Sequence, residues 1–112
     1  MSAENLELIR RGYEAFGRGD IGTVLGVLDP NIHWHIPGQR TQELAAGTFA
    51  IQVDDLLAGA QRVAVLCTVS AQRHGQHWSA PEVHVWRVAN GRAVEFREYQ
   101  GDQQAEDEFW SR

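Results

Sequence analysis

A carboxylate and several histidines lie inside stretches of this sequence that alternate like β-strands. The set is Glu98, His84, His35 and His33. A carboxylate buried in a mostly apolar cavity has a raised pKa, so it and a neighbouring imidazole both exchange protons near neutral pH. These residue types therefore indicate general acid/base chemistry, with Glu98 as the base. Two of the histidines together with Glu98 would also suit a metal ion, but their spacing is generic and we predict no metal site.

Strand alternation decides which of these side chains share a face of a sheet. In the stretch that contains His84, the even positions lie on one side. They are Trp78, Glu82, His84, Trp86 and Val88. In the last such stretch, Glu98 shares a side with Phe96. Around Trp34 two parities are open, because either the histidines beside it or Trp34 itself faces inward.

The elements that position these residues change period along the chain. Apolar residues at spacings of three and four predict a helix that begins near Ser2 or Asn5, and a second short helix after Asp20. From there a period of two predicts strands over residues 31–36, 48–57, 63–73, 77–88 and 92–100. Asn90 and Gly91 form a turn that joins antiparallel neighbours. We expect an α+β domain with helices on one face of a bent antiparallel sheet, which leaves a cavity.

Composition restricts the kind of protein that this sequence encodes. The 112 residues suit a single domain, residues 1–112, and the formal net charge of -5 without a basic run argues against a nucleic-acid partner. No apolar stretch approaches the ~20 residues needed to cross a bilayer, so we expect no membrane partner and a cytoplasmic location. Cys67 stands alone in an apolar run, and we expect it to be a buried, unreactive thiol.

Five strings of residues are similar, in order and spacing, to those of one known family. They are YEAFGRGD at 13–20, NIHWHIPG at 31–38, VHVWRV at 83–88, NGR at 90–92 and EFREY at 95–99. Together they resemble a SnoaL-like domain of the nuclear-transport-factor-like superfamily, which is related to ketosteroid isomerase and limonene epoxide hydrolase. The resemblance implies a cystatin-like α+β roll, in which a cone-like, curved antiparallel sheet carries the N-terminal helices on its concave face.

The resemblance also implies positions for the site residues. His84 falls where ketosteroid isomerase holds the aspartate of its oxyanion hole, and Glu98 matches the acidic residue of the epoxide hydrolase site. His33 and His35 lie opposite the hydrolase's pocket tyrosine and asparagine. We expect Glu98 to act as the base, with His84 and His35 orienting it or stabilising an enolate oxygen. The expected ligand-binding residues are Trp34, Trp86, Phe96, Tyr13, Phe16 and His33.

Other catalytic residues of these two enzymes are missing. Gly12 stands where the isomerase has its tyrosine, with Tyr13 one residue away, and Ile36 stands where its base precedes proline. Thr68 and Ser70 replace the arginine and aspartate of the hydrolase. The mechanisms of both enzymes are therefore disfavoured for this chain, since one fold hosts many chemistries.

The segment after the first strand is shorter than in the family. SnoaL-like domains carry a loop and a third helix there, whereas Gly38 is followed almost at once by residues 39–46. Either about 20 residues have been deleted or they are missing from this sequence, and the second is favoured because an open mouth would expose apolar cavity wall to water. A last helical segment is expected over residues 103–110.

Structural roles compete with the catalytic ones. Glu98 could pair at the rim with Arg97 or Arg92, and His84 could be a buried histidine whose hydrogen bonds are satisfied. The two histidines of the first strand could lie on the surface.

The sequence as a whole predicts a SnoaL-like small-molecule-binding protein that acts as a cofactor-independent isomerase, cyclase or hydrolase on a small apolar substrate. Two alternatives stay open, a non-catalytic ligand-binding domain and a protein-interaction module. A homodimer through the outer sheet face is compatible with all three. The residues expected to face outward there are Val63, Val65, Val83 and Val85.

Overall fold

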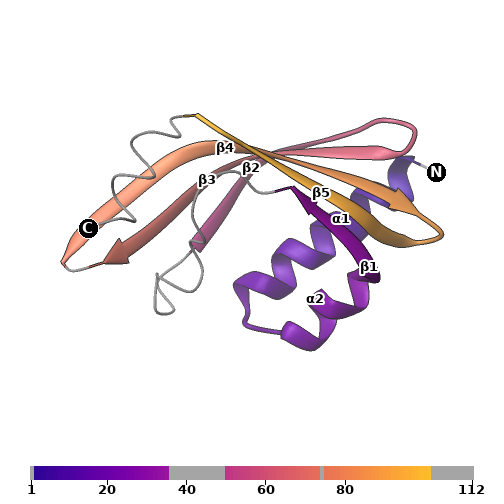
Figure 1. Cartoon of the computed structure of the whole chain (residues 1–112), viewed down its shortest axis with the longest axis horizontal. Coiled ribbons are helices and arrows are strands. Elements are labelled where there is room, and N and C mark those ends of the chain that lie inside the picture. The colour runs from indigo at the N-terminus through magenta and orange to yellow at the C-terminus, as the bar shows by residue number, and fades with distance from the viewer. Residues whose placement is uncertain (1, 36–49, 74, 102–112) are drawn as a thin grey trace.

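The computed structural model describes residues 2–35, 50–73 and 75–101, which form two helices and five strands (Figure 1). They are α1 (Ser2–Gly17), α2 (Ile21–Val27), β1 (Leu28–His35), β2 (Ala50–Ala58), β3 (Arg62–Arg73), β4 (Gln76–Ala89) and β5 (Arg92–Gln100). Each of the elements expected in this range is confirmed to within a few residues. The segments expected at 39–46 and 103–110 lie outside the described residues.

Both helices lie on one side of the sheet (Figure 1). Leu8, Ile9 and Ala15 are buried, which puts the apolar stripe of α1 against the strands. Asp20 caps α2, because its Oδ1 accepts a hydrogen bond from the backbone nitrogen of Thr23 at 3.2 Å. Neither helix of the described chain is long and apolar enough to cross a bilayer.

The five strands form one sheet in the order β1-β5-β4-β3-β2. Neighbours from β2 to β5 run antiparallel, as expected, whereas β1 runs parallel to β5. In the sequence β1 is followed by β2 at the opposite edge of the sheet, so no hairpin sets the direction of β1. The α+β class is confirmed, and the sheet is mixed rather than wholly antiparallel.

The turn between β4 and β5 follows the sequence signal. Asn90 and Gly91 have φ angles of 53° and 75°, the left-handed values that a two-residue hairpin turn requires. This turn holds β4 and β5 side by side, and their pairing places His84 opposite Glu98.

The core lies between α1 and one face of the sheet. On β3 the odd positions form its floor, and they are Val63, Val65, Cys67, Val69 and Ala71. The prediction that Val63 and Val65 face outward is wrong, since each is 0% exposed. Val65 is paired with His84, and directly paired side chains share a face of the sheet. The outer face instead carries Leu66 and Val83.

Candidate active site

A cavity of about 200 Å³ lies between the helices and the sheet. Its apolar wall residues are Ile9, Phe16, Val24, Val27, Leu28, Trp34, Ile51, Trp86 and Phe96. Among the described residues, the titratable side chains on this wall are Tyr13, His84 and Glu98. A concave apolar wall with a few polar groups at one end is typical of small-molecule sites.

Three aromatic rings form one side of the cavity. The Phe96 ring centroid lies 4.5 Å from that of Trp86 and 5.2 Å from that of Trp34. Trp34 is paired with Phe96 across β1 and β5, so both side chains face the cavity. Large rings at these separations present flat apolar surface, which suits a planar or alicyclic ligand.

The inward position of Trp34 turns its neighbours to the other face of β1. His33 and His35 are both exposed, and His35 Nε2 lies 3.3 Å from Glu95 Oε2. Both histidines therefore lie away from the cavity, contrary to the catalytic role expected for His35 and the ligand-binding role expected for His33. The parity of β1 depends on its register with β5, which local sequence does not reveal.

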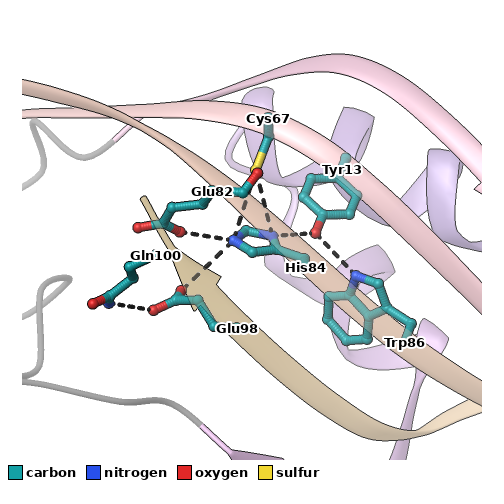
Figure 2. Close-up of polar contacts among 7 residues, drawn as sticks. All are labelled: Tyr13, Cys67, Glu82, His84, Trp86, Glu98 and Gln100. Carbon is teal, nitrogen blue, oxygen red and sulfur yellow. Dashed lines mark hydrogen bonds and ion pairs between the residues drawn. The ribbon is translucent and has the colours of Figure 1, made fainter. Parts of the chain in front are cut away.

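Polar side chains gather around the ring of His84 (Figure 2), which lies on the cavity wall. His84 is 3% exposed, and its Nδ1 lies 2.5 Å from Tyr13 Oη. Its Nε2 lies 2.9 Å from Oε1 of Glu82 and 3.6 Å from Oε1 of Glu98. Trp86 donates a hydrogen bond from Nε1 to Tyr13 Oη at 2.9 Å. These contacts join α1, β4 and β5 in one network.

Strand register explains why these groups meet. His84 is paired with Glu98, and Glu82 is paired with Gln100, so all four side chains project from the same face of β4 and β5. Gln100 Nε2 donates to Glu98 Oε2 at 2.9 Å, which orients that carboxyl. Tyr13 reaches the group from α1, and its ring stacks at a centroid distance of 5.9 Å from that of His84.

Burial dominates the titration of the two carboxyls. It raises the pKa of Glu82 from 4.5 to about 7. Burial also raises the pKa of Glu98 to about 7, and the neighbouring charge of Glu82 adds to that rise. Because the two carboxyls interact, they titrate as a pair. Near neutral pH this pair both accepts and releases protons, which is what an acid/base catalyst needs.

The remaining titratable groups of the network are neutral at pH 7. Burial lowers the pKa of His84 from 6.5 to about 4, against the attraction of Glu98. Burial also raises the pKa of Tyr13 well above its usual value. Cys67, whose Sγ lies 3.7 Å from His84 Nε2, has its pKa raised to about 12, chiefly by burial. Cys67 is thus a protonated thiol, in agreement with the unreactive role expected for it.

Glu82, His84 and Glu98 also bring possible metal ligands together, with one atom of each within 4.8 Å of the others. Both ring nitrogens of His84 are already within hydrogen-bonding distance of Tyr13 and Glu82. Because Nε2 and Glu82 Oε1 are only 2.9 Å apart, they share a proton in a hydrogen bond, and a cation could bind both atoms only by replacing that proton. The three side chains are thus arranged as a hydrogen-bonded network.

Glu82 is the titratable residue of the network that sequence reasoning missed. The sequence carried one signal for it, because Glu82 shares the even positions of its strand with His84 and Trp86. A carboxylate on an inward face has to be paired or protonated. Of the residues that the sequence did single out, those on the cavity wall are Tyr13, Phe16, Trp34, His84, Trp86, Phe96 and Glu98.

Two helices over one face of a mixed five-stranded sheet, with an apolar cavity between them, define an α+β roll of the cystatin-like kind. The chain belongs to the SnoaL-like domain family, whose model matches residues 9–96. The resemblance seen in the sequence is therefore confirmed.

Solved structures and a curated relative agree with this membership. Bal32a, from a soil-derived mobile gene cassette, is 30% identical with a TM-score of 0.90, covering 97% of this chain and 98% of that one. A Xanthomonas campestris protein of unknown function with a cystatin-like fold is 28% identical with a TM-score of 0.87, covering 96% and 98%. An uncharacterized Mycobacterium tuberculosis protein is 25% identical over 126 residues, covering 96% of both chains. The names of these three proteins assign no activity, so function has to be argued from the site.

Proposed function

We propose that the chain binds a planar, largely apolar small molecule and transfers protons on it without a cofactor. The observation that carries this proposal is Glu98, a carboxyl on the wall of an apolar cavity whose pKa burial raises to about 7. A base of that pKa is matched to neutral pH, because it is partly ionised there and still holds a proton firmly. The rings of Trp34, Trp86 and Phe96 supply the apolar surface that holds the ligand beside it.

The reaction that suits this site begins with removal of a proton from a carbon next to a carbonyl. Glu98 Oε1 takes the proton, the C–H electron pair forms a C=C bond, and the π pair of the carbonyl moves onto its oxygen to give an enolate. An isomerase returns the proton to another carbon, whereas a cyclase uses the enolate carbon to form a new bond within the same molecule. Hydrolysis is less well supported, because a positioned water needs two to four polar partners and the ring nitrogens of His84 already have theirs.

His84 is a positioning residue in this scheme. Its Nε2 lies 3.6 Å from Glu98 Oε1, and burial lowers the pKa of the ring to about 4, so it stays neutral beside the base. Since Tyr13 and Glu82 occupy its nitrogens, His84 has no N–H left to stabilise an enolate oxygen directly.

Hydrogen–deuterium exchange on small ketones tests the proposal. Planar ketones and enones are incubated with the protein in D₂O, and deuterium incorporation at their acidic C–H positions is followed by NMR. We expect Glu98→Gln to slow the exchange by about 100- to 10,000-fold, the range for loss of a general base. Glu95→Gln is the matched control, because Glu95 lies on the same strand but faces His35 on the outer side, and it should exchange like the wild type.

Tryptophan fluorescence separates binding from catalysis in the same samples. Trp34 and Trp86 line the cavity, so a bound ligand should quench them in the wild type and in Glu98→Gln alike. Quenching without exchange in any form of the protein would identify a non-catalytic binding domain. Equal exchange rates for the wild type and Glu98→Gln would rule out Glu98 as the base.

We further propose that the chain forms a homodimer through the outer sheet face. Four apolar side chains there, which we call the outer-face patch, are between 36% and 54% exposed. They are Leu57, Leu66, Val83 and Tyr99. Leu66, Val83 and Tyr99 form one row across β3, β4 and β5, because each is paired with the next. A contiguous apolar row of this kind is typical of a protein interface.

A further inference from the structure

The network around His84 is a chain of hydrogen bonds that runs from the cavity wall to a carboxyl behind it. Tyr13 lies on the wall, whereas Glu82 does not and has a side chain only 2% exposed. Between them, His84 contacts Tyr13 through Nδ1 and Glu82 through Nε2 (Figure 2). Trp86 contributes the fixed end, because an indole N–H only donates and Tyr13 Oη must accept from it.

The donors and acceptors of this chain can be satisfied in two ways. When Glu82 is ionised it accepts a hydrogen bond, so His84 carries its proton on Nε2 and accepts at Nδ1 from the hydroxyl of Tyr13. The single hydrogen of Tyr13 is then used, and its oxygen faces the cavity as an acceptor.

Protonation of Glu82 reverses the direction of both hydrogen bonds, the one between Glu82 and His84 and the one between His84 and Tyr13. The carboxylic acid now donates to Nε2, so neutral His84 carries its proton on Nδ1 and donates to Tyr13 Oη. Because that oxygen also accepts from Trp86, both of its lone pairs are occupied. The hydroxyl hydrogen of Tyr13 is then free to point into the cavity.

We propose that Glu82 is a positioning residue whose protonation, relayed through the tautomer of His84, turns Tyr13 from an acceptor into a donor toward the ligand. The inference deepens the proposed function, on which its catalytic consequence rests. In the microstate of the carboxyl pair in which Glu82 holds the proton and Glu98 is ionised, the cavity offers an O–H donor and a carboxylate base together. That pair is complementary to a carbonyl compound with an acidic C–H, because the donor stabilises the enolate oxygen while the base removes the proton.

Titratable groups from every element packed against His84 bear on this relay. Tyr13 reaches the ring from α1, Cys67 from β3 with Sγ 3.8 Å from Nδ1, and Glu98 from β5 with Oε1 3.6 Å from Nε2. Asp54 of β2 acts only indirectly, through its charge on Cys67. Burial keeps the pKa of His84 at about 4, so the ring changes tautomer rather than charge between neutral pH and pH 5.

Nitrogen NMR of the histidine side chains tests the relay without any substrate. In ¹⁵N-labelled protein the shifts of Nδ1 and Nε2 report which nitrogen carries the proton, and they are followed between about pH 5 and pH 9. We expect His84 to hold its proton on Nε2 at the alkaline end and on Nδ1 at the acid end. Glu82→Gln should abolish the pH dependence, because an amide does not titrate, whereas Glu82→Asp should retain it.

The matched control is Glu98→Gln, which removes the competing carboxyl and leaves Glu82 in place. The tautomer change should persist in that variant. A single tautomer over the whole range, formation of an imidazolium, or a change that is lost in Glu98→Gln would each overturn the proposal. Since the wild type alone gives the first two readouts, a Glu82 variant that does not fold leaves the test intact. A tautomer change without catalysed deuterium exchange would refute the proposed function and keep the relay.

Discussion

The buried carboxyl of Glu82 makes the stability of the fold depend on pH. Glu82 has a pKa of about 7 in the folded chain and 4.5 as its ordinary value, so between these values the folded state binds more protons than the unfolded state. Its contribution to stability is therefore present below about pH 4.5 and is lost as pH rises through 7. The pKa of His84 is lowered to about 4, so its contribution to stability increases as pH rises from 4 to 6.5. A variant of Glu82 is therefore needed to separate the two contributions.

We expect Glu82→Gln to gain stability relative to the wild type as pH rises from 5 to 8, by on the order of 2 kcal/mol after allowance for solvent screening. Urea unfolding at several pH values measures this difference. Glu4→Gln, at an exposed position in the first turn of α1, is the control, and its difference from the wild type should stay nearly constant between pH 5 and 8. A difference between Glu82→Gln and wild type that does not change with pH would show that Glu82 titrates as an exposed carboxyl.

Part of the site could be predicted from single residues. His84 and Glu98 were identified from residue type, alternation and resemblance, and the structure brings them together on paired positions. Glu82 was missed because a carboxylate on a strand is usually solvated, whereas in the folded chain this one is 4% exposed and lies against the ring of His84. His35 was misplaced because one residue of register turns every side chain of a strand to the other face.

At the scale of elements, the features that depend on neighbours in sequence were predicted and those that depend on pairing were not. Helix limits follow from apolar spacing and from the cap at Asp20, and the β4–β5 turn follows from Asn90 and Gly91. The parallel direction of β1 and the inward face of Val65 on β3 depend on which strands lie side by side. That information is spread over the whole sheet and has no local signature.

The β4–β5 turn should be sensitive to a side chain at its second position. Gly91 has a φ of 75°, where an L side chain meets its own backbone, so Gly91→Ala should lower the free energy of unfolding by about 1–2 kcal/mol. Gly26→Ala is the matched control. Gly26 lies within α2, and a methyl group at this position would extend into open space, so alanine there should stabilise by about 0.5–1 kcal/mol. Thermal or urea unfolding measures both, and equal effects of the two substitutions would contradict this account of the turn.

On the scale of the whole molecule, the two faces of the sheet carry different side chains. The helices and the cavity occupy the face that carries His84, whereas the outer-face patch lies on the opposite side of the same strands. Because side chains alternate along a strand, a substitution in the patch does not enter the cavity. Association through the outer face is therefore compatible with ligand binding on the inner face, and the two can be tested separately.

Substitution at the centre of the outer-face patch should separate the chains. Val83 is paired with Leu66 on one side and Tyr99 on the other, so Val83→Lys places a charge in the middle of the row. We expect the wild type to sediment as a dimer, at twice the 12.6 kDa of the chain, and Val83→Lys as a monomer. Leu25→Lys is the control, because Leu25 is 63% exposed on α2 and lies outside the patch. A monomeric wild type, or equal dissociation by both substitutions, would exclude this face as the interface. If Val83→Lys is monomeric and a ligand still quenches its tryptophan fluorescence, the cavity binds ligand within a single chain.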